Sequence, residues 1–210
     1  MKRENIPFLL VYSRLSIGPI MILLSFYFGK SESLLVFILM FIGLLSDIFD
    51  GIIARKLEVA TEKLRRADSN VDLVFWICTG IATYLMWPLV IMAKIEFIVL
   101  LFMLEGMCYT VSIIKFRKSP CTHSYMAKFW GIMLFFSLSY LIIFGEAGLL
   151  FSVCVAIGII ADIEVILITL TLEEWTYDIP SVYHAVKIRR GLEIKRYKLF
   201  NGLSRDRPEN

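Results

Sequence analysis

The chain has 210 residues, of which 58% are hydrophobic and 20% are charged, and its mean hydropathy is +0.73. This composition is too apolar for an ordinary water-soluble domain, so a membrane protein is the first expectation. The formal net charge is only +3, and we expect no nucleic-acid partner.

Apolar stretches follow one another along the chain, each close to the ~20 residues that a helix needs to cross a ~30 Å hydrocarbon layer. The alternating strand pattern of an outer-membrane barrel is absent from the sequence. We therefore predict an all-α, polytopic membrane helical bundle of six transmembrane helices. The predicted spans are Pro7–Phe28, Leu34–Ile53, Val71–Val90, Phe97–Lys115, Met126–Phe144 and Leu149–Thr171. The pair Trp87 and Pro88 is either the turn after the third span or a kink.

The links between these spans alternate in charge, so that nearly all lysines and arginines fall at one end of the spans. They gather before the first span, in the second link (Arg55–Arg66), in the fourth link (Lys115–Lys118) and after the sixth span (Lys187–Arg207). By the positive-inside rule, these segments and both termini are expected in the cytoplasm. We thus expect a six-helix transmembrane domain at residues 1–171 and a basic cytoplasmic C-terminal tail at residues 172–210, lying against anionic headgroups.

Four aspartates flank the second link. Asp47 and Asp50 are three residues apart, and Asp68 and Asp72 are four apart, so each pair projects from one face of its own helix. The short link makes these helices antiparallel neighbours, so the four carboxylates should converge at the inner edge of the membrane. Bare anions are costly there, and a cation is expected among them. Two Mg²⁺ or Mn²⁺ ions match the four charges and the oxygen ligands, whereas zinc is disfavoured because no His or Cys lies nearby.

A hard metal at the cytoplasmic edge predicts a phosphorylated ligand, because Mg²⁺ is commonly shared between carboxylates and substrate phosphates. Arg55 could contact that phosphate, and Gly51 would allow a ligand or helix to approach the backbone. Acidic residues at helix ends are often only paired interfacial charges. Four of them at helical spacing, around a glycine and an arginine, favour a site instead.

The stretch SDIFDGIIARKLEVATEKLRRADSNVD resembles the signature of the CDP-alcohol phosphatidyltransferases, DxxDGxxARx(8)GxxxDxxxD. Seven of its eight defined places are filled here, by Asp47, Asp50, Gly51, Ala54, Arg55, Asp68 and Asp72. The opening NIPFLLVYSRLSIGPI also looks like the first span of that family. One departure is Leu64, which stands where the signature has its second glycine, close to the nucleotide. Its extra volume puts the fit of the nucleotide in question.

The resemblance implies transfer of a phosphatidyl-type group from a CDP-linked lipid, such as CDP-diacylglycerol, to a small polar alcohol, with release of CMP. By residue, it implies the following roles: Asp47, Asp50 and Asp68 bind two metal ions, Asp72 is a further ligand or the general base, and Gly51, Ala54, Arg55 and the Leu64 position contact CDP. Lys118 and Lys128 are candidates to hold a phosphate on the acceptor, and the basic fourth link favours glycerol 3-phosphate. The active site would face the cytoplasm in phospholipid biosynthesis, and relatives tend to form homodimers.

Two other functions are compatible with the same residues. One is a metal-ion transporter, although transporter sites usually lie near the membrane midplane rather than at one interface. The other is a non-catalytic membrane homologue, which Leu64 leaves open. Arg14, inside the first span, either extends to the interface or faces the site. The membrane acids Glu105, Asp162 and Glu164 are expected to face the bundle interior in packing roles.

Overall fold

The computed structural model describes residues 6–57, 59 and 61–192. Within these residues the chain is helical and has no strand. The long helices are α1 (Ile6–Phe28), α2 (Ser33–Lys56), α3 (Glu62–Met86), α5 (Ile95–Phe116), α6 (Tyr125–Phe144) and α7 (Leu149–Thr171). The short helices are η2 (Gly29–Glu32), α4 (Pro88–Met92) and α8 (Val182–Arg189). The all-α prediction is confirmed.

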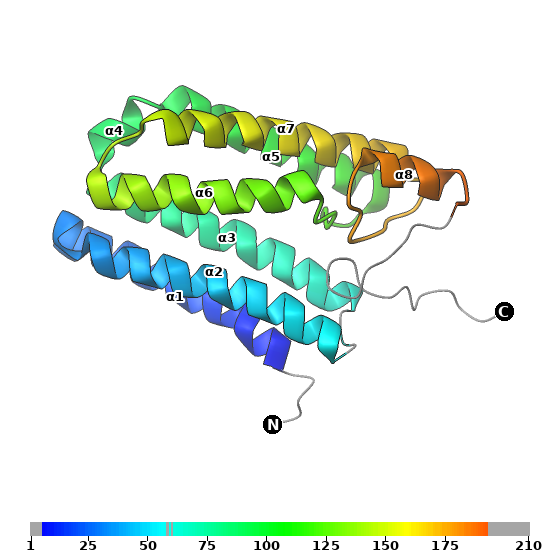
Figure 1. The fold of residues 1–210 in the computed structure, drawn as a ribbon, viewed down its shortest axis with the longest axis horizontal. Coiled ribbons are helices and arrows are strands. Elements are labelled where there is room, and N and C mark those ends of the chain that lie inside the picture. The colour runs from blue at the N-terminus through cyan, green and yellow to red at the C-terminus, as the bar shows by residue number, and fades with distance from the viewer. Residues whose placement is uncertain (1–5, 58, 60, 193–210) are drawn as a thin grey trace.

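The long helices run side by side along the long axis of the molecule (Figure 1). Helix α1 packs against α2 and α3, α6 packs against α2 and α7, and α5 packs against α7. The links between α2 and α3 and between α5 and α6 lie at one end, together with α8 (Figure 1). This end, which holds both aspartate pairs, is called the signature end below. Helix η2, helix α4 and the link between α6 and α7 lie at the opposite end.

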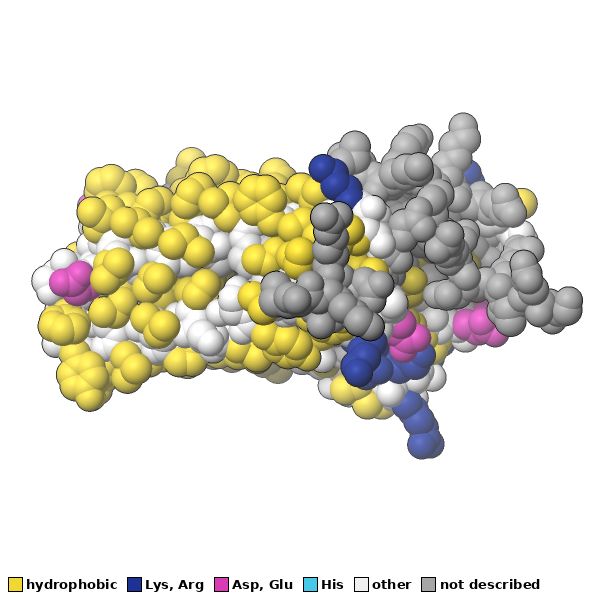
Figure 2. Space-filling model, turned by 90° about the horizontal axis from the view of Figure 1, so that it is seen from below, with side chains coloured by type: hydrophobic (Ala, Val, Ile, Leu, Met, Phe, Trp, Pro, Cys, Tyr) yellow, Lys and Arg dark blue, Asp and Glu magenta, His cyan; other side chains and the backbone are white. Residues whose placement is uncertain are grey.

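Five helical stretches of the described residues are long and apolar enough to cross a membrane. The first of them, Ile6–Lys56, continues through η2 and contains both α1 and α2, which pack against each other. Hydrophobic side chains cover the length of the bundle, and lysine and arginine gather toward one end (Figure 2). These features identify the chain as a helical membrane protein. The six-span count and the cytoplasmic termini stay predictions.

The third long helix begins nine residues before the predicted span. Thr61 is its N-cap, and the Thr61 side chain accepts a hydrogen bond from the Leu64 N–H at 3.3 Å. The first two turns are polar, so hydropathy could not find them. The helix ends at Met86, because Trp87 leaves helical geometry and Pro88 has no N–H to continue it. Trp87 and Pro88 thus separate α3 from α4 rather than kinking one span.

Helices α2 and α3 approach closely near the middle of the bundle. A Cβ atom on Gly43 would lie 2.3 Å from the ring of Phe75, so only glycine allows this contact. Phe75 belongs to the main buried cluster, which also contains Met21, Val36, Met40, Ala82, Met86, Phe135 and Ile142. The packing fixes the relative height of α2 and α3, and with it the height of the two aspartate pairs.

The described residues after α7 pack onto the signature end. Leu172, Ile179 and Ala185 are buried in a cluster with Ile168. Backbone bonds join this segment to the link between α5 and α6: Asp178 N–H donates to the Cys121 carbonyl at 3.2 Å, and Ile179 N–H donates to the Thr122 carbonyl at 2.7 Å. The rest of the predicted tail, residues 193–210, lies outside the described residues.

Candidate active site

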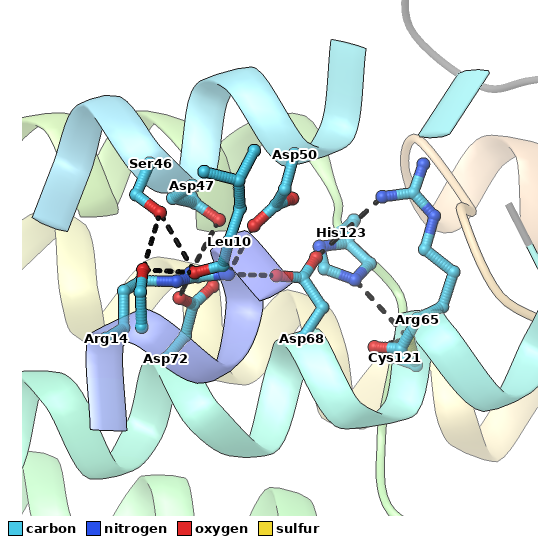
Figure 3. A network of polar contacts seen from close by, with 11 residues as sticks. Leu10, Arg14, Ser46, Asp47, Asp50, Arg65, Asp68, Asp72, Cys121 and His123 are labelled. Carbon is cyan, nitrogen blue, oxygen red and sulfur yellow. Dashed lines mark hydrogen bonds and ion pairs between the residues drawn. The ribbon is translucent and has the colours of Figure 1, made fainter. Parts of the chain in front are cut away.

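Four carboxylates meet around one guanidinium at the signature end (Figure 3). Asp47 and Asp50 come from α2, and Asp68 and Asp72 come from α3. Arg14 Nη1 lies 2.9 Å from Asp47 Oδ1 and also contacts Asp72. Arg14 Nη2 lies 2.5 Å from Asp50 Oδ2 and 2.7 Å from Asp68 Oδ1. We call the four aspartates the carboxylate cluster; their convergence is the arrangement that the sequence predicted.

Arg14 is fully buried two turns into α1 and faces the carboxylate cluster. A guanidinium among apolar helices requires counter-ions, and its planar fork can bond several carboxylates at once. Neighbouring hydroxyls hold this part of α1 against α2. The Ser46 Oγ donates to the Leu10 carbonyl at 3.0 Å, and the Ser13 Oγ donates to the same carbonyl at 2.7 Å. Of the two orientations open for Arg14, the structure has the one toward the site.

The cluster has an inner pair and an outer pair. The side chains of Asp50 and Asp68 are 4% and 6% exposed, whereas those of Asp47 and Asp72 are 34% and 27% exposed. Oxygen atoms of Asp47, Asp50 and Asp68 lie within 4.8 Å of one another, a spacing that fits a shared cation. The donor set is all oxygen, which suits Mg²⁺ or Mn²⁺. Asp72 is not one of these three and joins them through Arg14.

The predicted CDP contacts lie beside the cluster on the next turns of α2 and α3. The Arg55 guanidinium folds back toward Gly51, where a Cβ atom would lie 3.4 Å from Arg55 Nη1 and Nη2. Ala54 and Leu64 are buried in one apolar cluster with Val11 and Val71. The Leu64 side chain therefore occupies the space beside Ala54 that a glycine would leave open.

The two candidate acceptor residues have different surroundings. The Lys118 Nζ pairs with Glu62 Oε1 at 2.7 Å and lies 4.7 Å from the centroid of the Trp175 ring. Lys128, in the first turn of α6, is close enough to Asp47, Arg55 and Asp178 to interact electrostatically. Lys128 thus interacts electrostatically with one member of the carboxylate cluster, whereas Lys118 contacts Glu62 and Trp175.

The family model for CDP-alcohol phosphatidyltransferase matches residues 4–175, most of the chain. The chain belongs to the CDP-alcohol phosphatidyltransferase family. No curated protein and no solved structure matches it.

Members of the CDP-alcohol phosphatidyltransferase family are phosphotransferases of phospholipid biosynthesis, and they generally depend on divalent metal. Family membership and the long apolar helices together make this chain an integral membrane transferase that moves a phosphatidyl-type group from a CDP-alcohol. The family resemblance drawn from the signature is confirmed. The carboxylate cluster has the oxygen donors that such a metal requires.

Next to the carboxylate cluster, this CDP-alcohol phosphatidyltransferase has a buried ion pair that the sequence analysis did not identify. Arg65 Nε lies 3.3 Å from Asp178 Oδ2, and Arg65 Nη1 lies 3.8 Å from Asp68 Oδ2. Both side chains of the Arg65–Asp178 pair are about 5% exposed or less. Asp178 lies 113 positions after Arg65 in a loop, so no local spacing could reveal the pairing. The polar run LRRAD contains Arg65, but in the sequence it indicated only the cytoplasmic side of the second link.

Cys121 and His123 line the same side of the site from the link between α5 and α6 (Figure 3). The Cys121 Sγ donates to the Arg65 carbonyl at 3.2 Å, and burial raises the pKa of its thiol well above the usual value. Burial lowers the pKa of His123, whose Nε2 lies 3.3 Å from Cys121 Sγ. Near neutral pH the thiol is protonated and the imidazole is neutral. The expectation that no His or Cys lies near the aspartates is therefore wrong, because the fold brings both residues beside Asp68. A thiol and an imidazole are nevertheless not the ligands that Mg²⁺ and Mn²⁺ prefer.

Replacing Asp178 with asparagine is expected to lower the free energy of unfolding by about 2 kcal/mol, because the buried Arg65 loses its nearest counter-ion. The loss is smaller than for a completely isolated charge, since Asp68 stays 3.8 Å away. Asn tolerates the left-handed backbone of Asp178 (φ 56°), so backbone strain is not introduced. The thermal midpoint in detergent should fall by roughly 5 °C.

Glu173→Gln is the control, because it alters an exposed ion pair with Arg189 and should change the thermal midpoint little. An equal fall of the midpoint in the two variants would contradict a stabilising role for the buried Arg65–Asp178 pair.

A second acidic group lies between α5 and α7. Ligand atoms of Glu105, Cys108 and Asp162 are within 4.8 Å of one another. The Cys108 Sγ donates to the Asp162 carbonyl at 3.4 Å. Glu105 and Asp162 thus contact each other inside the bundle, on helices that contribute nothing to the carboxylate cluster.

Proposed function

We propose that this protein transfers a phosphatidyl-type group from CDP-diacylglycerol to a small polar alcohol, with release of CMP, at a site facing the cytoplasm. The observation that carries the proposal is the convergence of Asp47, Asp50, Asp68 and Asp72 at the signature end, in a chain of this family. A site at the end of an apolar bundle suits this chemistry. The acyl chains can stay in lipid while the alcohol and CMP exchange with water.

Two divalent ions, Mg²⁺ or Mn²⁺, held by Asp47, Asp50 and Asp68, would supply the charge that neutralises a pyrophosphate and its leaving group. The buried Asp50 and Asp68 offer oxygens shielded from water, where electrostatic attraction is strongest. Arg55, beside Gly51, is the residue on α2 that we assign to the CDP pyrophosphate. A guanidinium bonds two phosphate oxygens with its fork, which orients the phosphate as well as attracting it.

Asp72 is the general base in this proposal. It belongs to the outer, more exposed pair and lies outside the group of three closely spaced carboxylates. Its carboxylate accepts the proton of the acceptor hydroxyl as that oxygen attacks the lipid-side phosphorus. The phosphorus–oxygen bond to CMP then breaks, and CMP leaves without a covalent enzyme intermediate.

For the acceptor we propose a phosphorylated alcohol, with glycerol 3-phosphate as the first candidate. Lys128 lies within electrostatic reach of Asp178, Arg55 and Asp47. The lysine ammonium is a compact positive charge, so Lys128 could bind a phosphate group on the acceptor. Lys118 is the second candidate for this phosphate, because it already pairs with Glu62 and lies over the Trp175 ring.

The function is tested by CMP release from CDP-diacylglycerol with purified protein and a panel of acceptors: glycerol 3-phosphate, serine, inositol, inositol phosphate and an amino-alcohol. We expect release with one acceptor, in Mg²⁺ or Mn²⁺ but not in EDTA. Asp50→Asn should abolish it, because a buried metal oxygen is replaced by a neutral amide.

Asp162→Asn is the matched control, since it makes the same substitution at a buried aspartate of α7. Its rate should stay within a few-fold of the unmodified protein. Absence of CMP release with every acceptor, from folded protein in metal, would overturn the proposed function and favour a non-catalytic homologue.

A further inference from the structure

We propose that Arg14 is an internal counter-ion that competes with divalent metal for the carboxylate cluster and thereby sets the metal affinity of the site. This inference rests on the metal-dependent function proposed above. It assigns a role to the one buried cation in the described part of the chain that contacts all four signature aspartates.

The contacts of Arg14 define the competition. Its two terminal nitrogens divide the cluster, with Nη1 bound to Asp47 and Asp72 and Nη2 bound to Asp50 and Asp68. In the described part of the chain, its Nε has no hydrogen-bond partner. Among the described residues, the guanidinium is therefore held by the four aspartates alone, and three of these are the proposed metal ligands.

Charge repulsion allows only one type of cation at the three closely spaced aspartates at a time. Oxygens of Asp47, Asp50 and Asp68 lie within 4.8 Å of one another, and Arg14 approaches each of these residues within 2.9 Å. A cation shared by those three oxygens would lie next to the guanidinium, and two positive groups at such a distance in a buried site repel strongly. Metal binding therefore requires Arg14 to withdraw from the inner aspartates.

The same contacts explain why the cluster can exist without metal. Four carboxylates brought together at a bundle end repel one another and lose hydration. Arg14 supplies one positive charge at the centre and bonds every member. The single positive charge of Arg14 does not balance the four negative charges of the aspartates. Divalent cations carry more positive charge and can therefore replace it. Arg14 thus stabilises the metal-free fold and weakens metal binding through one set of bonds.

Arg14→Met tests the inference, because methionine retains a long apolar side chain and removes the charge. Mn²⁺ affinity is measured by titration calorimetry or by EPR of free Mn²⁺, and the thermal midpoint is measured in EDTA and in Mn²⁺. We expect at least tenfold tighter Mn²⁺ binding. We also expect a lower midpoint in EDTA and a larger rise on adding Mn²⁺ than in the unmodified protein.

Arg66→Met is the matched control, since Arg66 is 40% exposed on α3 and pairs with Glu62 rather than with the cluster. It should leave both measurements unchanged. If Arg14→Met does not fold, Arg14→Lys decides: a lysine has no fork to bond four carboxylates, so Mn²⁺ binding should still tighten.

Mn²⁺ binding that is unchanged or weaker in the Arg14 variants would overturn the inference while leaving the proposed function intact. Absence of Mn²⁺ binding to both unmodified and variant proteins would overturn the metal site itself, and the inference with it. The two failures are therefore distinguishable without any measurement of activity.

Discussion

Replacing Asp72 with asparagine is expected to reduce CMP release by about 10³-fold, within the range for loss of a general base, while Mn²⁺ still binds. The amide cannot accept the acceptor's proton. The three closely spaced oxygens of Asp47, Asp50 and Asp68 are untouched by the substitution. The measurement is turnover at saturating acceptor, together with Mn²⁺ affinity on the same preparation.

Asp68→Asn provides the comparison, because the buried Asp68 belongs to the closely spaced group and should lose both turnover and Mn²⁺ affinity. Equal loss of Mn²⁺ affinity in both variants would make Asp72 a metal ligand rather than the base. Release by Asp72→Asn at the unmodified rate would remove Asp72 from the mechanism.

Replacing Leu64 with glycine is expected to have opposite effects on stability and on binding of the CDP-lipid. The Leu64 side chain is buried with Val11, Ala54 and Val71, so its removal should lower the free energy of unfolding by about 3 to 5 kcal/mol. We propose that the nucleotide of the CDP-lipid borders the space opened beside Ala54. We therefore expect a lower KM for CDP-diacylglycerol, measured by CMP release at varied lipid concentration.

Leu64→Ala separates the two effects. It creates most of the same cavity but keeps a Cβ atom on the backbone, so it should destabilise similarly and improve KM less. A KM unchanged in both variants would show that the nucleotide does not border this position. Leu64 would then be a packing residue with no effect on substrate fit.

The carboxylate cluster was predictable because its determinants are local. Spacings of three and four residues place each aspartate pair on one helix face, and a short link between α2 and α3 leaves few ways to arrange the two helices. The family signature added the expected chemistry. Hydropathy located the apolar part of each helix, but not the first turns of α3, which are polar and begin at the Thr61 cap.

The contacts that complete the site depend on tertiary structure. Arg14 lies 33 positions before Asp47, and either orientation of its side chain was compatible with the sequence. Whether an arginine two turns inside a helix extends to the interface or turns inward is decided by the side chains of the neighbouring helices. The Arg65–Asp178 pair is a stronger example, because Asp178 reaches Arg65 only when the chain after α7 folds back onto the link before α6.

That return of the chain after α7 has a practical consequence for protein engineering. Thr171 ends the last apolar helix, so hydropathy suggests it as a fragment boundary. A fragment cut there would lack Asp178 and the backbone partners of Cys121 and Thr122, and it would leave the Arg65 guanidinium without its nearest carboxylate. Chimeras that exchange the catalytic unit should therefore join their partner sequences beyond α8, after Leu192.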